Sequence, residues 1–512
     1  MLEALRHSAR LLEVARTLAR YRLAAEARRL VPAPARLFFR LVGLGARPTC
    51  AADLSPGRRL ALALEDLGPP YIKLGQVLAT RPDLTSAELA RDLRSLQDHL
   101  KPFPEPQARA AIAAEFGQSA ETLFADFASE PVAAASIAQV HRARTQDGRD
   151  VAVKLLRPGI EARFARELAF FRWGAALIER HHARARRLRP VAVIDTLGRS
   201  VAREMDLRLE AAALSELADN MASTPGYRLP QPVWSLTGQR VFTLEWIDGI
   251  PLSDIARVRA AGIDTKPYAA RLVQVFLTQA MRDGYFHADL HQGNLLITPD
   301  GDLAAVDFGI MGRLSRADRR YLADILYGFI ERDYRLIAEA HFAAGYVPGH
   351  HRVEDFAAAL RAIGEPIMGR PASEISVGRL LAQLFATTEA FDMPTQPHLL
   401  LLQKTMMMVE GLAIELDDQV NMWAVSRPVI EAWFAENMAP EVLAADRLIE
   451  HWRLLKRVPG LINRVEDLVK QAAARQDEDA TAPPPRPVWP AWCVAGAAAA
   501  LAALLALKAF AG

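Results

Sequence analysis

Apolar residues recur at three- and four-residue intervals through the first 30 positions, with Arg between them. This period predicts an amphipathic helix, and the Arg residues that recur from Arg6 to Arg22 interrupt the apolar stretch that a secretory signal peptide needs. Two interpretations are open, an interfacial helix attracted to anionic lipid and a helix packed on the main body. The helical pattern continues to about residue 100, where three prolines in the six residues 101–106 predict a boundary.

The pattern changes to strand between residues 131 and 157, where β-branched residues alternate with polar ones on both sides of Asp147-Gly148. An Asp-Gly turn between two such runs predicts a β-hairpin. Residues 160–222 return to a helical period, residues 225–249 are strand-like with turns, and the chain from about 251 is mainly helical, interrupted near 286–312. This succession predicts a mixed α+β fold.

An uncharged stretch runs from Val488 to about Leu507, after a Pro-rich segment at 481–490 that predicts a stiff extended spacer. Twenty helical residues at about 1.5 Å each cover the roughly 30 Å of a hydrocarbon layer. We therefore predict one transmembrane helix at 488–511, with Trp489 and Trp492 as interfacial anchors. The alternative is an Ala-rich buried helix.

The basic residues beside this stretch predict its orientation. Lys470, Arg475 and Arg486 precede it, and only Lys508 follows it. The positive-inside rule then places the large domain on the cytoplasmic side of the inner membrane.

Composition limits the class of protein. With 512 residues, 51% hydrophobic and 24% charged, the chain is long enough for several folded domains. A net charge of +2 gives no general attraction to nucleic acid, so we expect no nucleic-acid partner. Cys50 and Cys493 are the only cysteines, too few for a disulfide framework or a zinc cluster.

The most specific chemical signal is FHADLHQGNLLI followed by AAVDFGI. Protein kinases use H-R-D-x-x-x-x-N and then D-F-G to transfer phosphate, and Asp289 and Asn294 have that same five-residue offset. Asp307-Phe308-Gly309 completes the second motif. We therefore expect ATP and Mg²⁺ as cofactors, Asn294 and Asp307 as metal ligands, and Asp289 as the group that orients the attacking hydroxyl or water.

The predicted hairpin ends in VAVK, which places Lys154 where a kinase lysine contacts the α- and β-phosphates. That lysine needs a carboxylate to orient it, and the helical segment 203–214 offers Glu204, Asp206 and Glu210, among which position alone does not choose. Where a kinase has a Gly-rich loop, this hairpin has only alanines and a serine, which predicts a stiffer cover over the nucleotide. The residues expected to contact the nucleotide are Ala133, Ala134, Ala135, Ser136, Val140, Lys154 and the backbone from Glu245 to Ile247.

Together, the Ala-rich loop, VAVK, the E-x-D helix, HADLHQGN and VDFG resemble the UbiB family of atypical kinases, from roughly residue 50 to 420. That family also has a K-x-G-Q motif, which Lys73-Leu74-Gly75-Gln76 matches. The resemblance implies that the N-terminal helices fold over the site and that Lys73 and Gln76 are regulatory. Without it, a helix C-terminal cap would be the preferred role of Lys73.

The resemblance also implies partners for the two lysines. Lys73 is expected to meet the pair Glu204 and Asp206, and Lys154 is expected to meet Glu210. Ala288 stands where ordinary protein kinases have the loop arginine that reads activation-loop phosphorylation, so we expect no such control. Two departures from the UbiB pattern stand out, and the first is that Leu290 and Gln292 replace two prolines of the usual HADPHPGN. Bacterial members also often have two membrane helices, where one is found here.

We therefore expect an α+β chain with an atypical protein-kinase-like bilobal fold, an N-terminal helical extension and a C-terminal transmembrane helix. The expected segments are the extension at 1–100, the N-lobe at 101–248, the C-lobe at 249–430, a helical region at 431–480, a Pro-rich linker at 481–487 and the membrane helix at 488–511.

The resemblance implies a membrane-anchored kinase or ATPase that supports ubiquinone biosynthesis. Its expected partners are membrane lipids, quinone precursors and quinone-biosynthesis enzymes. One alternative is a small-molecule or lipid-precursor kinase, although such enzymes lack the motif of Lys73 and Gln76. Another is a scaffold for biosynthetic enzymes that uses nucleotide only as a switch.

Overall fold

The computed structural model describes residues 2–23, 54–79, 87–93, 96, 101–181, 186, 189–367, 383, 386–394 and 397–437. The linker expected at 481–487 and the membrane helix expected at 488–511 lie outside these residues. Among the helices that the structure describes, none is both long and apolar enough to cross a bilayer.

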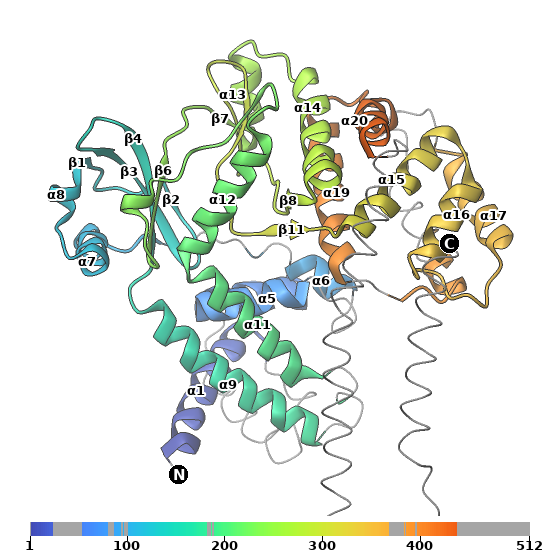
Figure 1. Ribbon diagram of the computed structural model, residues 1–512. Coiled ribbons are helices and arrows are strands. Elements are labelled where there is room, and N and C mark those ends of the chain that lie inside the picture. Colours follow the sequence, from blue (N-terminus) through green and yellow to red (C-terminus); the bar gives the residue numbers. More distant parts are fainter. Residues whose placement is uncertain are drawn as a thin grey trace, which may run out of the picture.

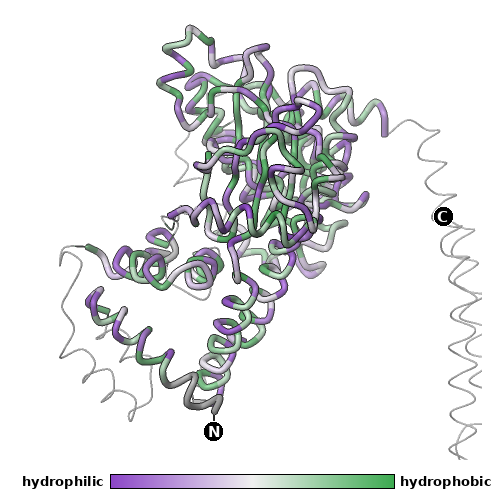
Figure 2. The backbone as a smooth tube through the Cα atoms, turned by 90° about the vertical axis from the view of Figure 1, so that its left-hand side faces the viewer, coloured by the Kyte–Doolittle hydropathy of each residue, from purple (hydrophilic) through white to green (hydrophobic). Residues whose placement is uncertain are grey.

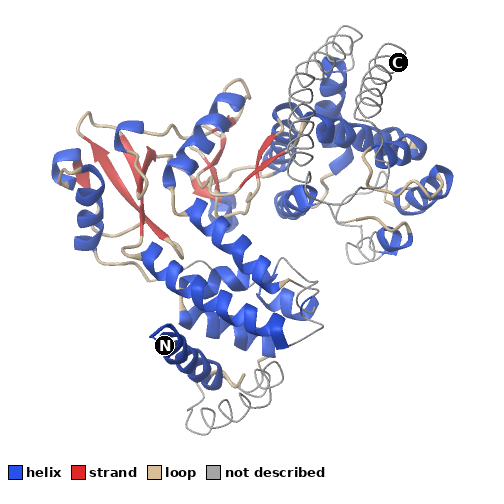
Figure 3. Ribbon diagram, turned by 60° about the horizontal axis from the view of Figure 1, so that its bottom comes forward, coloured by secondary structure: helices blue, strands red, loops and turns tan. Residues whose placement is uncertain are grey.

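A five-stranded antiparallel sheet forms the first lobe, at the opposite end of the molecule from the C-terminal helices (Figures 1 and 3). The predicted hairpin is confirmed as β3 (Ala138–Thr145) and β4 (Asp150–Leu156), and Gly148, at φ 85°, supplies the left-handed turn residue. The other strands are β1 (Phe124–Phe127), β2 (Ala133–Ala134) and β6 (Val241–Glu245), in the order β1-β3-β4-β6 with β2 on β3. The helices α7 (Glu105–Phe116) and α8 (Ala120–Leu123) complete the lobe, and Ile112, Phe124 and Val153 lie in its core.

The N-terminal helices form a second body below this sheet (Figure 1). They are α1 (Leu2–Arg20), α4 (Pro56–Leu67), α5 (Pro69–Ala79) and α6 (Ala87–Leu93). Two helices of the segment expected as N-lobe, α9 (Ile160–His181) and α11 (Pro190–Glu204), pack with α5, because their buried faces meet the same apolar core. The N-terminal extension therefore packs on the rest of the protein through contacts between α5 and the two helices α9 and α11.

Helix α1 is amphipathic, as predicted, and Figure 2 shows the helices near the N-terminus alternating between apolar and polar residues along their turns. Its apolar side faces the protein, since Ala15 and Ala19 are buried. Arg10 pairs with Glu167 of α9 at 2.9 Å, and Arg20 pairs with Asp66 of α4 at 2.7 Å. Of the two interpretations, the structure shows the helix packed on the main body.

The second lobe combines two small sheets with helices. One sheet has the order β5-β10-β9-β7 and the other pairs β11 with β8. The strands are β5 (Tyr227–Arg228), β7 (Ile250–Pro251), β8 (Tyr285–His287), β9 (Leu295–Ile297), β10 (Leu303–Ala305) and β11 (Met311–Arg313). The helices of the second lobe are α13 (Ile255–Ala260), α14 (Lys266–Leu277), the π-helical η3 (Thr278–Asp283), α15 (Arg316–Glu331), α16 (Tyr334–Ala343), α17 (Val353–Gly364), α19 (Pro397–Leu416) and α20 (Met422–Asn437). Helix α12 (Leu207–Met221) contacts both β6 of the first lobe and η3 of the second.

The domain boundary expected at residue 430 needs correction, because it falls inside α20. Ile430 and Trp433 are both buried in the main core, and the Trp433 indole N–H donates to the backbone oxygen of Met281 at 2.9 Å. The buried apolar face of α20 continues past residue 430, so a domain boundary there would cut through a single helix and its core contacts. The C-lobe therefore extends at least to Asn437.

Candidate active site

The catalytic loop runs from β8 to β9 and is held by buried side chains at its start. His287 is fully buried, and its Nδ1 accepts the backbone N–H of Asp289 at 3.1 Å. The ring proton therefore lies on Nε2, which donates to the backbone oxygen of Asp307. Burial lowers the pKa of His287, so the ring is neutral at pH 7. This histidine joins the catalytic loop to the DFG segment.

The two positions that depart from the family's prolines are held in other ways. Leu290 is fully buried in the core of the lobe. Gln292 is exposed, and its carbonyl accepts the backbone N–H of Ser253 at 3.0 Å. Ala288, in place of the loop arginine, is also fully buried. Packing and one backbone hydrogen bond thus constrain the loop where the family commonly has proline.

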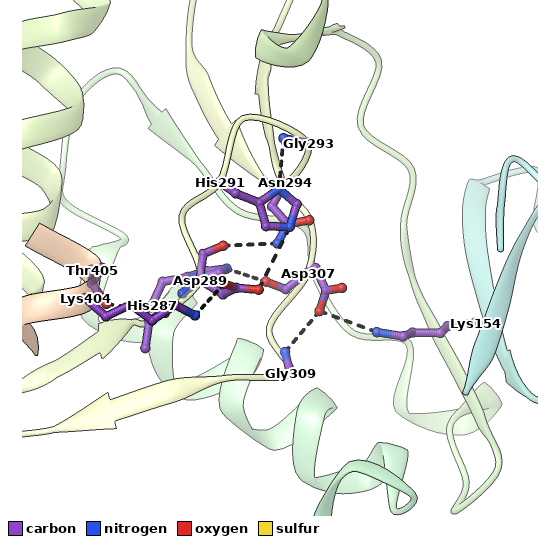
Figure 4. Close-up of polar contacts among 11 residues, drawn as sticks. Lys154, His287, Asp289, His291, Gly293, Asn294, Asp307, Gly309, Lys404 and Thr405 are labelled. Atoms are coloured by element: carbon purple, nitrogen blue, oxygen red, sulfur yellow. Dashed lines mark hydrogen bonds and ion pairs between the residues drawn. The ribbon is translucent and has the colours of Figure 1, made fainter. Parts of the chain in front are cut away.

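Within the part of the chain that the structure describes, the amide oxygen of Asn294 has no hydrogen-bond partner, so it is available to a ligand. Its Nδ2 donates to the backbone oxygen of Asp289 at 3.1 Å, and its backbone oxygen accepts the N–H of Val306 at 3.1 Å. Asn294 is buried, and Figure 4 shows its side chain near Asp307. An amide oxygen and a carboxylate are oxygen donors of the kind Mg²⁺ prefers, so these residues fit the metal that the sequence predicts.

Lys154 lies between two carboxylates. Its Nζ is 2.7 Å from Oε1 of Glu210 on α12 and 3.5 Å from Oδ1 of Asp307. The structure therefore brings Lys154 together with Glu210, the partner that the resemblance implies. Glu210 extends from the first turn of α12, a helix that Asp206 caps.

The surroundings of Lys154 and Asp307 keep both side chains ionised. Burial by itself would raise the pKa of Asp307, but Lys154 and the Gly309 N–H at 3.1 Å outweigh it and lower that pKa to about 2. Burial would also lower the pKa of Lys154, whereas Asp307 and Glu210 raise it above its usual value. Burial raises the pKa of Glu210, and Lys154 offsets only part of that rise. The site thus presents a charged Lys154 ammonium and a charged Asp307 carboxylate at neutral pH.

The K-x-G-Q motif lies on α5, against the end of α11. Lys73 pairs with Glu204 at 2.9 Å, as expected, whereas Asp206 caps α12 through the Arg208 N–H and also pairs with the Arg208 side chain at 2.8 Å. Gln76 lies one turn further along α5. Glu204 is the last residue of α11, so Lys73 lies at a helix C-terminus, and the helix-cap role stays a prediction.

Gly75 has a steric reason to be glycine. A Cβ at this position would lie 2.3 Å from Cδ1 of Leu96 and 2.8 Å from Cδ1 of Leu64. Helix α5 can approach its neighbours this closely only without a side chain at Gly75. The motif therefore combines one ion pair with one close helix contact.

The Ala-rich loop pairs with strand β3 of the hairpin through backbone hydrogen bonds. Ala133 pairs with Val140 in the sheet, and the Ala135 N–H donates to the Ala138 oxygen at 2.8 Å. Ser136 is almost fully buried. Val140 lies directly opposite Lys154 in the β3-β4 ladder, so these side chains share one face of the sheet.

The segment between the lobes starts at Glu245, whose carboxylate pairs with Arg228 at 2.6 Å and whose N–H donates to Gln231. The next N–H, of Trp246, donates to the Asp150 oxygen at 3.1 Å. Among the residues described, the backbone N–H and C=O of Ile247 have no hydrogen-bond partner. Of Glu245 and Ile247, the two residues expected to contact the adenine, Ile247 is the one whose backbone N–H and C=O can hydrogen-bond to it.

Sequence reasoning missed Lys404. This residue extends from α19, and its Nζ lies 3.2 Å from Oδ1 of Asp289 (Figure 4). The rarity of lysine could have pointed to it, because only eight of the 62 basic residues are Lys. Three of the eight lie in ion pairs of this region, namely Lys73, Lys154 and Lys404. A chain that otherwise uses Arg keeps Lys where a compact ammonium is needed.

The chain matches two known domain families and a solved structure. Residues 95–341 match the ABC1 atypical kinase-like domain, and residues 360–421 match the UbiB helical domain. A solved complex of Rv3197 with erythromycin, from Mycobacterium tuberculosis, is similar with a TM-score of 0.52 and 25% identity, covering 72% of this chain and 93% of that one.

Several relatives are described as probable protein kinase UbiB. The one from Marinobacter nauticus is 39% identical, covering 86% of this chain and 81% of the relative. The one from Cellvibrio japonicus is 40% identical, covering 88% and 80%, and the one from Pseudomonas aeruginosa is 39% identical, covering 93% and 89%. With this identity over most of its length and a kinase-type catalytic loop beside a lysine–glutamate pair, the chain belongs to the UbiB family of atypical kinase-like proteins.

Proposed function

We propose that this protein is an ATP- and Mg²⁺-dependent enzyme that hydrolyses ATP or transfers its γ-phosphate. The observation that carries the proposal is the position of Lys154, within 2.7 Å of Glu210 and 3.5 Å of Asp307. Lysine, its orienting carboxylate and the DFG carboxylate thereby lie together, as phosphoryl transfer requires.

The nucleotide lies between the lobes in this proposal. The free backbone groups of Ile247 bind the adenine, and the Ala-rich loop and Val140 cover the phosphates. Lys154 neutralises the α- and β-phosphates, while Asn294 and Asp307 hold Mg²⁺. When bound, that ion neutralises the charge that develops as the γ-phosphoryl group moves.

Asp289 and Lys404 then act at the attacking end. The Asp289 carboxylate orients water or a hydroxyl for in-line attack, and Lys404 restrains that carboxylate through the 3.2 Å ion pair. In this proposal the same ammonium also stabilises negative charge on the transferred group, a role for which preorganised cations are effective. Helix α19, in the helical domain, thus becomes part of the phosphate site.

We further propose that the activity supports ubiquinone biosynthesis at the cytoplasmic face of the inner membrane, as membership of the UbiB family suggests. Membrane lipids, quinone precursors and quinone-biosynthesis enzymes are the partners in this proposal, and the segment at 488–511 is the anchor. The Lys73–Glu204 pair on α5 favours this function over that of a small-molecule kinase, which lacks this motif.

The test is phosphate release from ATP and Mg²⁺ by the full-length protein in lipid nanodiscs, beside Asp307→Asn. Asp418→Asn, at an exposed position, is the matched control. We expect turnover in the wild type and the control and none in Asp307→Asn. In a quinone-deficient deletion strain, the wild type and the control should restore growth and Asp307→Asn should not. Equal turnover in all three proteins would contradict the assignment of the site. Complementation by a catalytically inactive Asp289→Asn would favour the nucleotide-switched scaffold.

A further inference from the structure

Two adjacent histidines and one aspartate converge in the C-terminal helical region, away from the nucleotide site. His350 and His351 precede α17, and Asp392 follows the helical residues 386–390. The Nε2 atoms of His350 and His351 lie 3.3 and 3.2 Å from the same atom, Oδ2 of Asp392. All three potential ligand atoms lie within 4.8 Å of one another.

These spacings suit a tetrahedral metal. Bonds of about 2.0 Å from zinc to imidazole nitrogen or carboxylate oxygen place neighbouring ligand atoms about 3.3 Å apart. The two distances from imidazole nitrogen to Asp392 already have this length. A small adjustment of side chains would therefore complete three corners of a tetrahedron.

Packing holds the ligands near this arrangement. The His351 ring lies 5.1 Å from the ring of Phe391, which in turn lies 4.9 Å from Phe356 in the core of α16 and α17. Asp392 occupies a left-handed turn at φ 50°, which Asp tolerates better than most residues. Its N–H donates to the Glu389 oxygen at 3.2 Å. Among the described residues, the hydrogen-bond and ion-pair partners of the Asp392 carboxylate are the two imidazoles.

We propose that His350, His351 and Asp392 form a binding site for a divalent transition metal, with Zn²⁺ as the best match. Two imidazoles and one carboxylate are ligands that zinc accepts, and water would occupy the fourth position. The metal would join the start of α17 to the turn at Asp392 and so close the chain between them. The site is independent of the proposed phosphate chemistry, whose oxygen donors suit Mg²⁺ instead.

The test uses tag-free, full-length protein that has been stripped with a chelator. Titration with Co²⁺, followed by visible absorption, and with Zn²⁺, followed by calorimetry, measures affinity and coordination together. All proteins carry Asp307→Asn, so that binding at the nucleotide site does not contribute. We expect one equivalent, the strong absorption of four-coordinate Co²⁺, and a melting temperature that rises with Zn²⁺.

The variants are His350→Ala and Asp392→Asn, both at positions about two-thirds exposed, where the fold should tolerate them. Each is expected to weaken Zn²⁺ binding at least about tenfold, the lower bound for lost metal-site groups, and to remove the Zn²⁺-dependent rise in melting temperature. Asp355→Asn, at an exposed position of α17, is the charge-matched control and should bind as the parent does. Equal affinity in the parent and both variants, or no binding by the parent, would leave a hydrogen-bonded cluster only and overturn the proposal.

Discussion

Two lysine–carboxylate pairs flank the proposed phosphate site, and they differ in burial. The side chains of Lys154 and Glu210 are 16% and 9% exposed, whereas those of Lys404 and Asp289 are 43% and 28% exposed. A buried pair cannot lose one partner without leaving a desolvated charge. An exposed pair contributes little to stability and can exchange partners when a substrate arrives. The first pair therefore builds the site, and the second is free to take part in the reaction.

Removing the buried pair should have the largest effect. We expect Lys154→Met to lower kcat by about 10²- to 10³-fold and the free energy of unfolding by about 3 kcal/mol, because Glu210 is left buried without its cation. Phosphate release and urea unfolding measure both quantities. Lys266→Met, at an exposed position, should change neither. Normal stability of Lys154→Met would show that the pair is not structurally important.

Removing the exposed pair should separate activity from stability. We expect Lys404→Met to lower kcat by about 10- to 100-fold, within the range of a lost electrostatic contact, while unfolding changes by less than about 1 kcal/mol. ATP affinity should be nearly unchanged, since Lys404 lies beside Asp289 at the attacking end. An unfolding loss as large as that of Lys154→Met would remove the contrast between the two pairs.

Close packing of α5 at Gly75 is a third kind of contact, which differs from both ion pairs. We expect Gly75→Ala to lower the free energy of unfolding by about 1–3 kcal/mol, because the new Cβ meets Leu96 and Leu64 at 2.3 and 2.8 Å. Gly174→Ala in α9 is the matched control, since its Cβ would meet no atom within 4 Å, and it should be neutral or slightly stabilising. Thermal unfolding of both variants gives the comparison, and equal melting temperatures would contradict close packing at Gly75.

The smallest expected effect is a pH dependence from buried His287. Burial lowers its folded-state pKa, so the unfolded state binds a proton below about pH 6.5 that the folded state does not. His287 therefore contributes stability above that pH and loses it as the pH falls. Urea unfolding between pH 7.5 and 5 should show a steeper loss for the wild type than for His287→Gln. Equal slopes in the two proteins would contradict this contribution of His287.

Local spacing made much of the site predictable. The hairpin before Lys154 follows from alternating strands around an Asp-Gly turn, and the offset from Asp289 to Asn294 lies within one loop. Over such distances the backbone alone limits where side chains can lie. The expected C-lobe boundary at 430 failed for the opposite reason, since the apolar face of α20 is defined only by the helices it packs against.

The hairpin, the catalytic loop, the DFG segment and the family to which they belong can all be predicted from the order of amino acids. Position along the chain left open which carboxylate meets Lys154, and Glu210 was implied by the family resemblance alone. The contact of Lys404 with Asp289, and those of His350 and His351 with Asp392, became visible in the folded structure. Glu210 is 56 positions from Lys154, and Lys404 is 115 positions from Asp289. The physical reason is that such contacts depend on how whole helices pack, and no local period or spacing along the chain encodes that packing.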